Sequence, residues 1–475
     1  MSSIVKALME SYSNSSAGFL YWFRRRLDTH RGVLFGVCCV YFLSSFVSTT
    51  LTRYGAPPAG EWARQFDKEE WVLLSRPRIL RGDEMHYLLM ANSLGRDGDL
   101  RLSWDYANVL RGGLDMGFWH RGYPAREPWI HFTRMNDARH GQYSLVGRHP
   151  VGFSALLALL LWPLAGTSWM EAASIWVTVV AAVLGLHFLL RILETRGTWP
   201  RARNTALLVA FATPYWSYAR TLYTEIYMAL GYLMVLYLVL KGLTWRSIPV
   251  LSVLAWFKYP ALLLFLSAGV GEWLQKRRRN FFIVGVSGAA VLLAITLFNR
   301  WFYHRTGFMV FDSTAPLRAR TGISAPIRWV PGNIDSNLWR LISDGDKGLF
   351  SYTPVLALAL AGLVPMWRRD RDLCRLLLVC AVPWFVLHIT YRYMLAGDSY
   401  STRYLVPIIP LVMLGIPWFV EAARGMAWRI LFGAAVTWSL ACNILAGMFP
   451  ATSFSRTPPE MFVSAARIVR TLIFG

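Results

Sequence analysis

Residues 248–270 read IPVLSVLAWFKYPALLLFLSAGV, and this apolar run is interrupted near its middle by Lys258, Tyr259 and Pro260. Proline ends or kinks a helix because it has no backbone N–H and its ring clashes with the preceding turn. The run therefore predicts two half-length helices joined as a hairpin, not one helix that crosses a membrane. Broken backbone at membrane depth is tolerated only where protein buries it or where it lines a cavity, so the hairpin indicates an internal cavity.

The rest of the chain is just as apolar. Of its 475 residues, 55% are hydrophobic and 16% are charged, which excludes an ordinary soluble domain. About ten or eleven apolar runs are long enough to enter a bilayer, and we predict an all-α polytopic transmembrane bundle of about 9–13 membrane segments, some half-length. Besides 248–270 and the short run Val151–Ala165, the clearest runs are Val33–Thr52, Ala172–Leu190, Ala206–Tyr218, Ile226–Leu240, Phe281–Phe302, Leu349–Met366, Leu373–Met394, Tyr404–Val420 and Ile430–Met448.

Charge indicates a topology and argues against nucleic acid as a partner. The net charge is +22, but the basic residues form short clusters between apolar runs, as in the cytoplasmic loops of membrane proteins. Residues 1–32 are basic, so we expect a cytoplasmic N-terminus followed by an uncleaved anchor. If every run crossed, the basic loops 191–203 and 241–246 would lie outside while 276–279 would lie inside. If the runs 248–270 and Val151–Ala165 both fail to cross, all three loops face the cytoplasm. The expected organisation is a membrane domain at 33–448, outer loops at 53–149 and 303–348, and an outer tail at 449–475.

An acidic pair opens the most informative part of the first outer loop. Residues 81–108 read RGDEMHYLLMANSLGRDGDLRLSWDYAN, and we expect Asp83 and Glu84 to begin a short amphipathic helix. In that helix Asp83, His86 and Tyr87 share one face. A carboxylate held at a membrane surface can deprotonate an incoming hydroxyl, or share a divalent cation with its neighbour. The alternative is a pair of acids that only satisfies the free N–H groups of a helix start.

Two further turns carry charges beside predicted spans. Residues 213–225 hold Arg220 and Glu225 among aromatic side chains, and there we expect Arg220 to meet an anion and Glu225 to orient that anion or a hydroxyl. Residues 344–354 hold Lys347, a second candidate for contact with a phosphate. The alternatives are an aromatic belt with a local ion pair, and an ordinary polar loop.

The loop 391–405 is the best candidate for binding a phosphate. Arg392 and Arg403 flank it, Asp398 lies between them and Tyr404 follows. The guanidinium fork suits bidentate recognition of phosphate. Arginines on the outer side run against the positive-inside tendency, so we expect them to bind something anionic. Contact with lipid headgroups is the alternative.

Together these segments resemble the GT-C superfamily of polytopic glycosyltransferases, which includes protein O-mannosyltransferases, lipid A aminoarabinose transferases and mycobacterial arabinofuranosyltransferases. The similar elements occur in order along the chain, and each element alone is weakly specific for the superfamily. The family's usual Gly-Pro-Arg-Tyr-Leu element appears here as STRYL at 401–405. Ser401 and Thr402 replace Gly-Pro, and only Arg-Tyr-Leu is retained. The others are GDEMHYL at 82–88, DGDL at 97–100, YS at 143–144 with HPVG at 149–152, YTE at 223–225 and GLFSYTP at 348–354.

The resemblance implies a transferase that moves a sugar, a pentose such as arabinose or a hexose such as mannose, from a polyprenyl-phosphate donor. The acceptor would be a hydroxyl of a protein, lipid or glycan at the periplasmic face of a bacterial inner membrane. Asp83 matches the family's base or metal ligand, and Glu84 would orient it or share a divalent cation. His86, Tyr87 and His149 would contact substrate, unless His149 is structural. A transporter or flippase of lipid-linked glycans, and an O-antigen-ligase-like enzyme with a diphosphate-linked donor, stay open.

Overall fold

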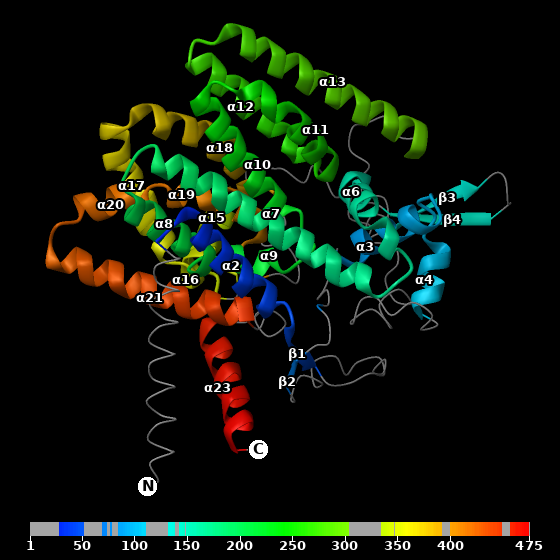
Figure 1. The fold of residues 1–475 in the computed structure, drawn as a ribbon, viewed down its shortest axis with the longest axis horizontal. Coiled ribbons are helices and arrows are strands. Elements are labelled where there is room, and N and C mark those ends of the chain that lie inside the picture. Colours follow the sequence, from blue (N-terminus) through cyan, green and yellow to red (C-terminus); the bar gives the residue numbers. More distant parts are fainter. Residues whose placement is uncertain are drawn as a thin grey trace, which may run out of the picture.

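The computed structural model describes residues 28–51, 69–73, 77, 84–110, 132–137, 142–147, 149–303, 334–345, 347–391, 400–448 and 457–474. These ranges form a helical bundle with two small antiparallel hairpins (Figure 1). Among the described residues, the helices long and apolar enough to cross a membrane are Trp169–Glu194, Arg278–Phe302, Arg371–Ile389 and Met426–Met448. A pair bent by 50°, Arg403–Met413 and Ile416–Ala422, can add a fifth span. The chain is a multi-pass membrane protein, and the predicted polytopic bundle is confirmed.

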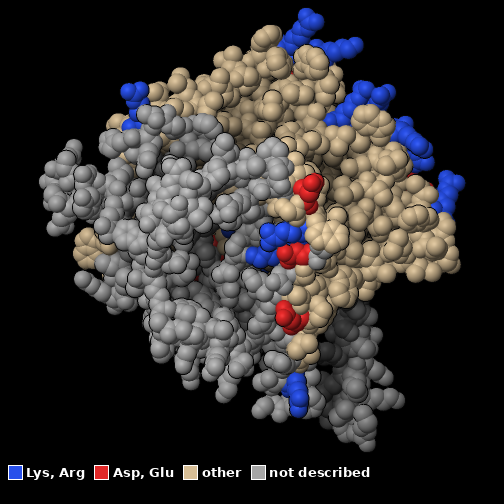
Figure 2. Space-filling view, turned by 180° about the vertical axis from the view of Figure 1, so that it is seen from behind, with Lys and Arg blue, Asp and Glu red and all other residues tan. Residues whose placement is uncertain are grey.

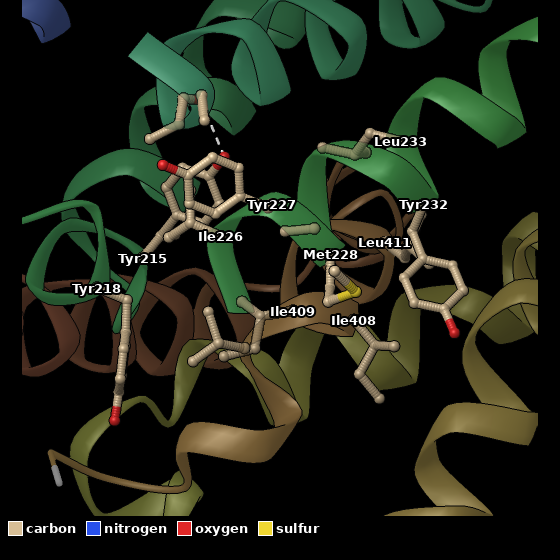
Figure 3. Packing of buried hydrophobic residues seen from close by; sticks show 14 of the residues in the cluster. Tyr215, Tyr218, Ile226, Tyr227, Met228, Tyr232, Leu233, Ile408, Ile409 and Leu411 are labelled. Carbon is tan, nitrogen blue, oxygen red and sulfur yellow. Dashed lines mark hydrogen bonds between the residues drawn. The ribbon is translucent and has the colours of Figure 1, made fainter. Parts of the chain in front are cut away.

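Two parallel helices form the centre of the bundle. Along α7 (Trp169–Glu194) and α10 (Glu225–Lys241), Thr178 and Tyr227 share a 3.0 Å hydrogen bond, and further on the rings of Phe188 and Tyr237 are 5.6 Å apart. The contacts follow the same order on both helices, so both begin at one end of the bundle. The opposite face of α10 packs against η5 (Arg403–Ile408) and α19 (Ile409–Met413), as Figure 3 shows. Such close packing holds the start of α10 rigidly.

The broken run forms the predicted hairpin. α11 (Ile248–Phe257) leads to the short turn η3 (Tyr259–Ala261), and α12 (Leu262–Leu274) returns along α13 (Arg278–Tyr303). At the open end the Thr244 hydroxyl donates a hydrogen bond to Glu272. At the tip, the rings of Trp256 and Phe298 lie 5.2 Å apart, near the far end of α13. Both ends of the run therefore lie on one side of the bundle, as expected from Pro260 and Lys258.

The basic loops lie together at one end of the molecule, here called the basic end. Ion pairs join Arg196 to Asp370 at 3.4 Å and Arg201 to Glu421, linking the loop after α7 to the neighbouring helix termini. At the same end His30, the first residue of α2 (His30–Ser44), lies 2.8 Å from Glu194. Figure 2 shows Lys and Arg spaced along the upper and right-hand edges of the described surface, and others near its centre beside Asp and Glu. The loops that the charge pattern assigns to the cytoplasm are thus gathered in space.

The expected first span is shorter than its apolar run. The run Val33–Thr52 predicted one helix, but α2 ends at Ser44 and β1 (Val47–Leu51) pairs with β2 (Glu69–Leu73). The hydroxyls of Ser44 and Ser45 turn back onto the carbonyls of Tyr41 and Phe42, which competes with continuation of the helix. The β-branched residues that follow favour a strand. A second hairpin, β3 (Phe132–Asp137) with β4 (Gln142–Gly147), was also not predicted.

The first-loop helix is more deeply buried than predicted. α3 (Glu84–Arg96) begins in the expected place, but its residues from Glu84 to Ser93 are all buried. It packs on α6 (Val151–Leu161), where the Ser154 hydroxyl donates to the carbonyl of Tyr87 at 2.9 Å. A helix surrounded by protein on all sides belongs to the core. The first loop therefore contributes part of the interior, not a helix resting on the membrane.

The remaining helices complete the bundle. Their bounds are α4 (Ser103–Leu110), η1 (Trp162–Leu164), α8 (Trp199–Phe211), α9 (Tyr215–Ala219), η2 (Thr244–Ser247), α15 (Ile334–Ser343), α16 (Leu349–Tyr352), α17 (Val355–Arg369), α18 (Arg371–Ile389), α20 (Ile416–Ala422), α21 (Met426–Met448) and α23 (Pro458–Phe474).

Candidate functional site

A buried carboxylate with two cations lies where α10 begins, away from the basic end. Glu225, the first residue of α10, is only 1% exposed. Its Oε1 lies 2.8 Å from Lys258 Nζ and 3.3 Å from Arg403 Nε. The three side chains come from α10, from the tip of the α11–α12 hairpin and from the start of η5. One carboxylate thus contacts two cations, and these three side chains are here called the charge cluster.

Aromatic rings enclose the charge cluster. The Arg403 guanidinium lies 4.4 Å from the centre of the Tyr223 ring and 4.8 Å from that of Tyr404. Lys258 Nζ lies 4.6 Å from the centre of the Tyr404 ring. The buried ring of His388, in α18, has its centre 5.3 Å from that of Tyr404. Cations over aromatic faces are stabilised by the ring quadrupole, most strongly when water is excluded. The rings therefore hold both cations in place without neutralising them.

Sequence reasoning missed Lys258 as a member of the site. It was interpreted only as a charge that interrupts the apolar run together with the helix breaker Pro260. Its backbone is extended, with φ −156° and ψ 118°. A charged residue in the middle of an apolar run is costly in a membrane unless it is paired, so it marks a functional position by default. That signal was present in the sequence. The partner, Glu225, is 33 residues away and could not be identified from spacing.

The first-loop helix α3 reaches the segment that precedes the charge cluster. Glu84 is fully buried, and its Oε2 accepts a 2.9 Å hydrogen bond from the N–H of Leu222. On the same helix, His86 stacks on His149 with ring centres 5.7 Å apart, and Tyr87 lies 4.9 Å from His149. The structure therefore brings these predicted residues together. Leu222 directly precedes Tyr223, which connects this group to Arg403.

An aromatic wall continues from α3 to the hairpin tip. The rings of Tyr87 and Phe153 are 5.3 Å apart, and Phe153 lies 5.3 Å from Phe257 and 5.0 Å from Tyr227. Phe257 directly precedes Lys258. The acidic helix start and the cationic hairpin tip therefore border one aromatic, buried region.

Lys347 joins this region through its backbone. Its N–H donates to Asp344 Oδ1 at 2.9 Å, and its carbonyl accepts from Thr402 Oγ1 at 2.8 Å. Thr402 directly precedes Arg403, so two loops that the sequence proposed independently are joined in space. The Lys347 side chain is half-buried.

Arg220 binds backbone carbonyls in the structure. The residue is 5% exposed, and its guanidinium donates to the carbonyls of Val47 at 2.7 Å, Gly447 and Met448. These carbonyls lie in β1 and at the end of α21, so Arg220 ties chain segments together. Its terminal nitrogens are already engaged, and Glu225 pairs with Lys258 and Arg403 instead. We propose that Arg220 is a structural residue, while the expectation that it meets an anion stays a prediction.

Replacing Arg220 with methionine is expected to destabilise the protein. Each buried carbonyl left unsatisfied costs about 1–3 kcal/mol, whereas affinity for a phosphate ligand in the surviving folded protein should not change. Thermal unfolding in detergent measures the first effect and equilibrium ligand binding the second. A normal melting temperature combined with lost phosphate binding would contradict the structural role.

Three predicted residues, Asp83, Arg392 and Asp398, lie outside the described residues. Within the described ranges, no group of three or more His, Cys, Asp or Glu side chains is arranged to hold a metal ion. One carboxylate oxygen of Glu84 accepts a hydrogen bond from the backbone N–H of Leu222.

Comparison with known proteins gives matches only among solved structures; no family model and no curated protein matches. ArnT from Cupriavidus metallidurans in the apo state is 15% identical, with a TM-score of 0.46, over 91% of this chain and 65% of that one. The archaeal oligosaccharyltransferase AglB from Archaeoglobus fulgidus, in complex with an inhibitory peptide and a dolichol-phosphate, is 12% identical, with a TM-score of 0.44, over 93% and 58%.

The Archaeoglobus fulgidus oligosaccharyltransferase in complex with Zn and sulfate is 13% identical, with a TM-score of 0.47, over 93% of this chain and 56% of that one. This chain thus spans less than two thirds of the length of each of these proteins.

Proposed function

We propose that this chain is a membrane glycosyltransferase of the GT-C type, which moves a sugar from a polyprenyl-phosphate donor to a hydroxyl of a protein, lipid or glycan. The observation that carries the proposal is the charge cluster of Glu225, Lys258 and Arg403. Its three side chains hold two positive charges and one negative charge in a buried, aromatic setting. Two cations held together in this way suit recognition of the negative charge of a phosphate diester.

The chemistry assigns a task to each part of the site. A lipid phosphate is already a good leaving group, so the protein has to hold it and stabilise the charge that develops as the glycosidic bond breaks. Lys258 and Arg403 perform this task, with Arg392 and Lys347 assisting. Asp83 removes the proton from the acceptor hydroxyl as general base. Its neighbour Glu84 is anchored to the Leu222 N–H, which would fix the helix start beside the charge cluster.

The other predicted residues are assigned to the substrates. We place His86, Tyr87 and His149 beside the sugar or acceptor, since they form a continuous aromatic surface next to Glu84. Asp398 and Tyr404 belong to the donor side, and the Tyr404 ring already contacts both cations. Asp83 and Glu84 are also the pair that would hold a divalent cation.

Positive-inside bias supports an orientation for this chemistry. The basic end would face the cytoplasm of a bacterial inner membrane, and the charge cluster, at the opposite ends of α7 and α10, would face the periplasm. Donor lipid would enter the site from within the membrane.

Replacing Arg403 with alanine tests the phosphate site. Loss of one charged hydrogen bond should weaken binding of a polyprenyl monophosphate by about 1.5–3 kcal/mol, or roughly 10- to 150-fold. Arg429, exposed near the start of α21 at the basic end, provides the matched control. Arg429→Ala should bind normally. Equal donor affinity in the Arg403→Ala and wild-type proteins would remove phosphate binding from the role of the charge cluster.

A further inference from the structure

Ser401 combines two unfavourable features at one position. Its φ is +48°, in the left-handed region that side chains other than glycine rarely adopt. Its side chain is fully buried, and its hydroxyl oxygen has no hydrogen-bond partner within the part of the chain that the structure describes. A buried hydroxyl without a partner loses its interaction with water and gains nothing in return. Glycine at this position would avoid both costs, so the serine calls for an explanation.

Neighbouring bonds hold Ser401 in this conformation. The carbonyl of Tyr400 accepts from the Tyr218 hydroxyl at 2.6 Å, and the Tyr400 hydroxyl bonds to Asn443 Oδ1 at 3.1 Å. On the other side, Thr402 Oγ1 donates to the carbonyl of Lys347. Strained backbone persists only where its surroundings fix it in this way, and such positions concentrate at ligand sites.

The position of Ser401 indicates what its missing partner is. It is two residues before Arg403, whose N–H bonds to the Ser401 carbonyl at 3.2 Å. The hydroxyl can donate one hydrogen bond, and the neighbouring charge cluster attracts anions. Because the oxygen is closed to bulk water, its partner has to be a group that the protein admits at this point. An anionic oxygen satisfies both conditions.

We propose that Ser401 is a donor-binding residue whose hydroxyl donates a hydrogen bond to a phosphate oxygen of the lipid-linked donor. This inference rests on the proposed function, and it adds a neutral hydrogen-bond donor to the two cations. The serine is kept at a strained, buried position because the ligand supplies the partner that the protein does not.

Two variants separate the hydroxyl from the strain, and a third controls for strain alone. Ser401→Ala removes the hydroxyl and keeps the strained backbone, whereas Ser401→Gly removes both. Lys276, with φ +60° in the turn between α12 and α13, is the matched control. Lys276→Gly relieves similar strain at the basic end, away from the charge cluster. Binding of a synthetic polyprenyl monophosphate, without a sugar, is measured in detergent together with the melting temperature.

Both Ser401 variants should bind the probe about tenfold more weakly, the effect of one lost hydrogen bond to a charged group. Ser401→Gly and Lys276→Gly should both melt at higher temperature, and Lys276→Gly should bind normally. A more stable protein with weaker binding is not expected from a purely structural serine. If Ser401→Ala fails to fold, the probe affinity of Ser401→Gly alone tests the proposed hydrogen bond.

Normal affinity in a folded Ser401→Gly protein overturns this inference alone. A loss of affinity that appears only with a sugar-bearing probe assigns the hydroxyl to the sugar and also overturns it. A wild-type protein that does not bind the monophosphate overturns the proposed function, and this inference with it.

Discussion

Replacing Glu225 with glutamine is expected to lower the free energy of unfolding by about 3–5 kcal/mol, because it leaves the buried Arg403 and the partly buried Lys258 without their counter-charge. Lys258 lies 2.8 Å from this carboxylate and Arg403 lies 3.3 Å from it. Glutamine keeps the shape of the side chain and one oxygen acceptor, so the loss would come from charge and not from packing. The melting temperature of the purified protein in detergent measures the effect.

A second replacement provides the control. In the double variant Glu225→Gln/Lys258→Met, one of the unpaired cations is also removed, and methionine has a similar length. The double variant should therefore be more stable than Glu225→Gln alone, which a double-mutant cycle reports as a coupling energy. Additive losses would show that the two groups act independently and that the charge cluster is not a unit.

Replacing Asp83 with asparagine is expected to reduce turnover by 10²–10⁴-fold, which is typical of the loss of a general base. Asparagine preserves shape and removes basicity, so the variant should fold and bind donor normally. Single-turnover kinetics with a polyprenyl-phosphate sugar measure the chemical step apart from binding. Near-normal turnover in this variant would contradict the assignment of Asp83 as general base and would favour Glu225 or Asp398 for that role.

Variants of two nearby acidic residues serve as controls for this result. Asp97 is exposed in the same loop and pairs with Arg96 at 3.4 Å, so Asp97→Asn should have little effect on turnover. Glu84→Gln keeps an acceptor for the Leu222 N–H and should be mild if Glu84 only anchors the helix start. If Asp83 and Glu84 share a divalent cation, both variants should be severely impaired, and activity should depend on added metal.

Local signals in the sequence were sufficient for much of the fold. Pro260 and Lys258 predicted a hairpin because a helix breaker and a charge act on the residues beside them, and the hairpin is present. The end of α2 was placed too late because hydropathy alone does not register hydroxyls that turn back onto the helix, as at Ser44 and Ser45. Strand pairing between β1 and β2 depends on a segment 18 residues further along, which the apolar run does not contain.

In the candidate site, too, local sequence signals did not identify the partners of each residue. Asp83 and Glu84 stood out because they are adjacent, whereas Lys258 stood alone in an apolar run and its partner lies in another helix. Arg220 was expected to bind a phosphate because an outer arginine suits an anion. Its actual partners are carbonyls at 47, 447 and 448, which no motif predicts. Pairings between segments far apart in the chain depend on the packed bundle and not on local pattern.

Incubation of the purified protein with a synthetic, isotopically labelled polyprenyl-phosphate sugar is the most direct test of a glycosyltransferase. Cell-envelope extract would supply acceptor hydroxyls, and the Asp83→Asn protein would serve as the control. We expect release of polyprenyl phosphate and transfer of label to acceptor by the wild-type protein, with both reduced by 10²–10⁴-fold in the variant. Donor that is bound but never cleaved, or moved intact across vesicle membranes by the purified protein, would contradict a transferase and indicate a transporter of lipid-linked glycans.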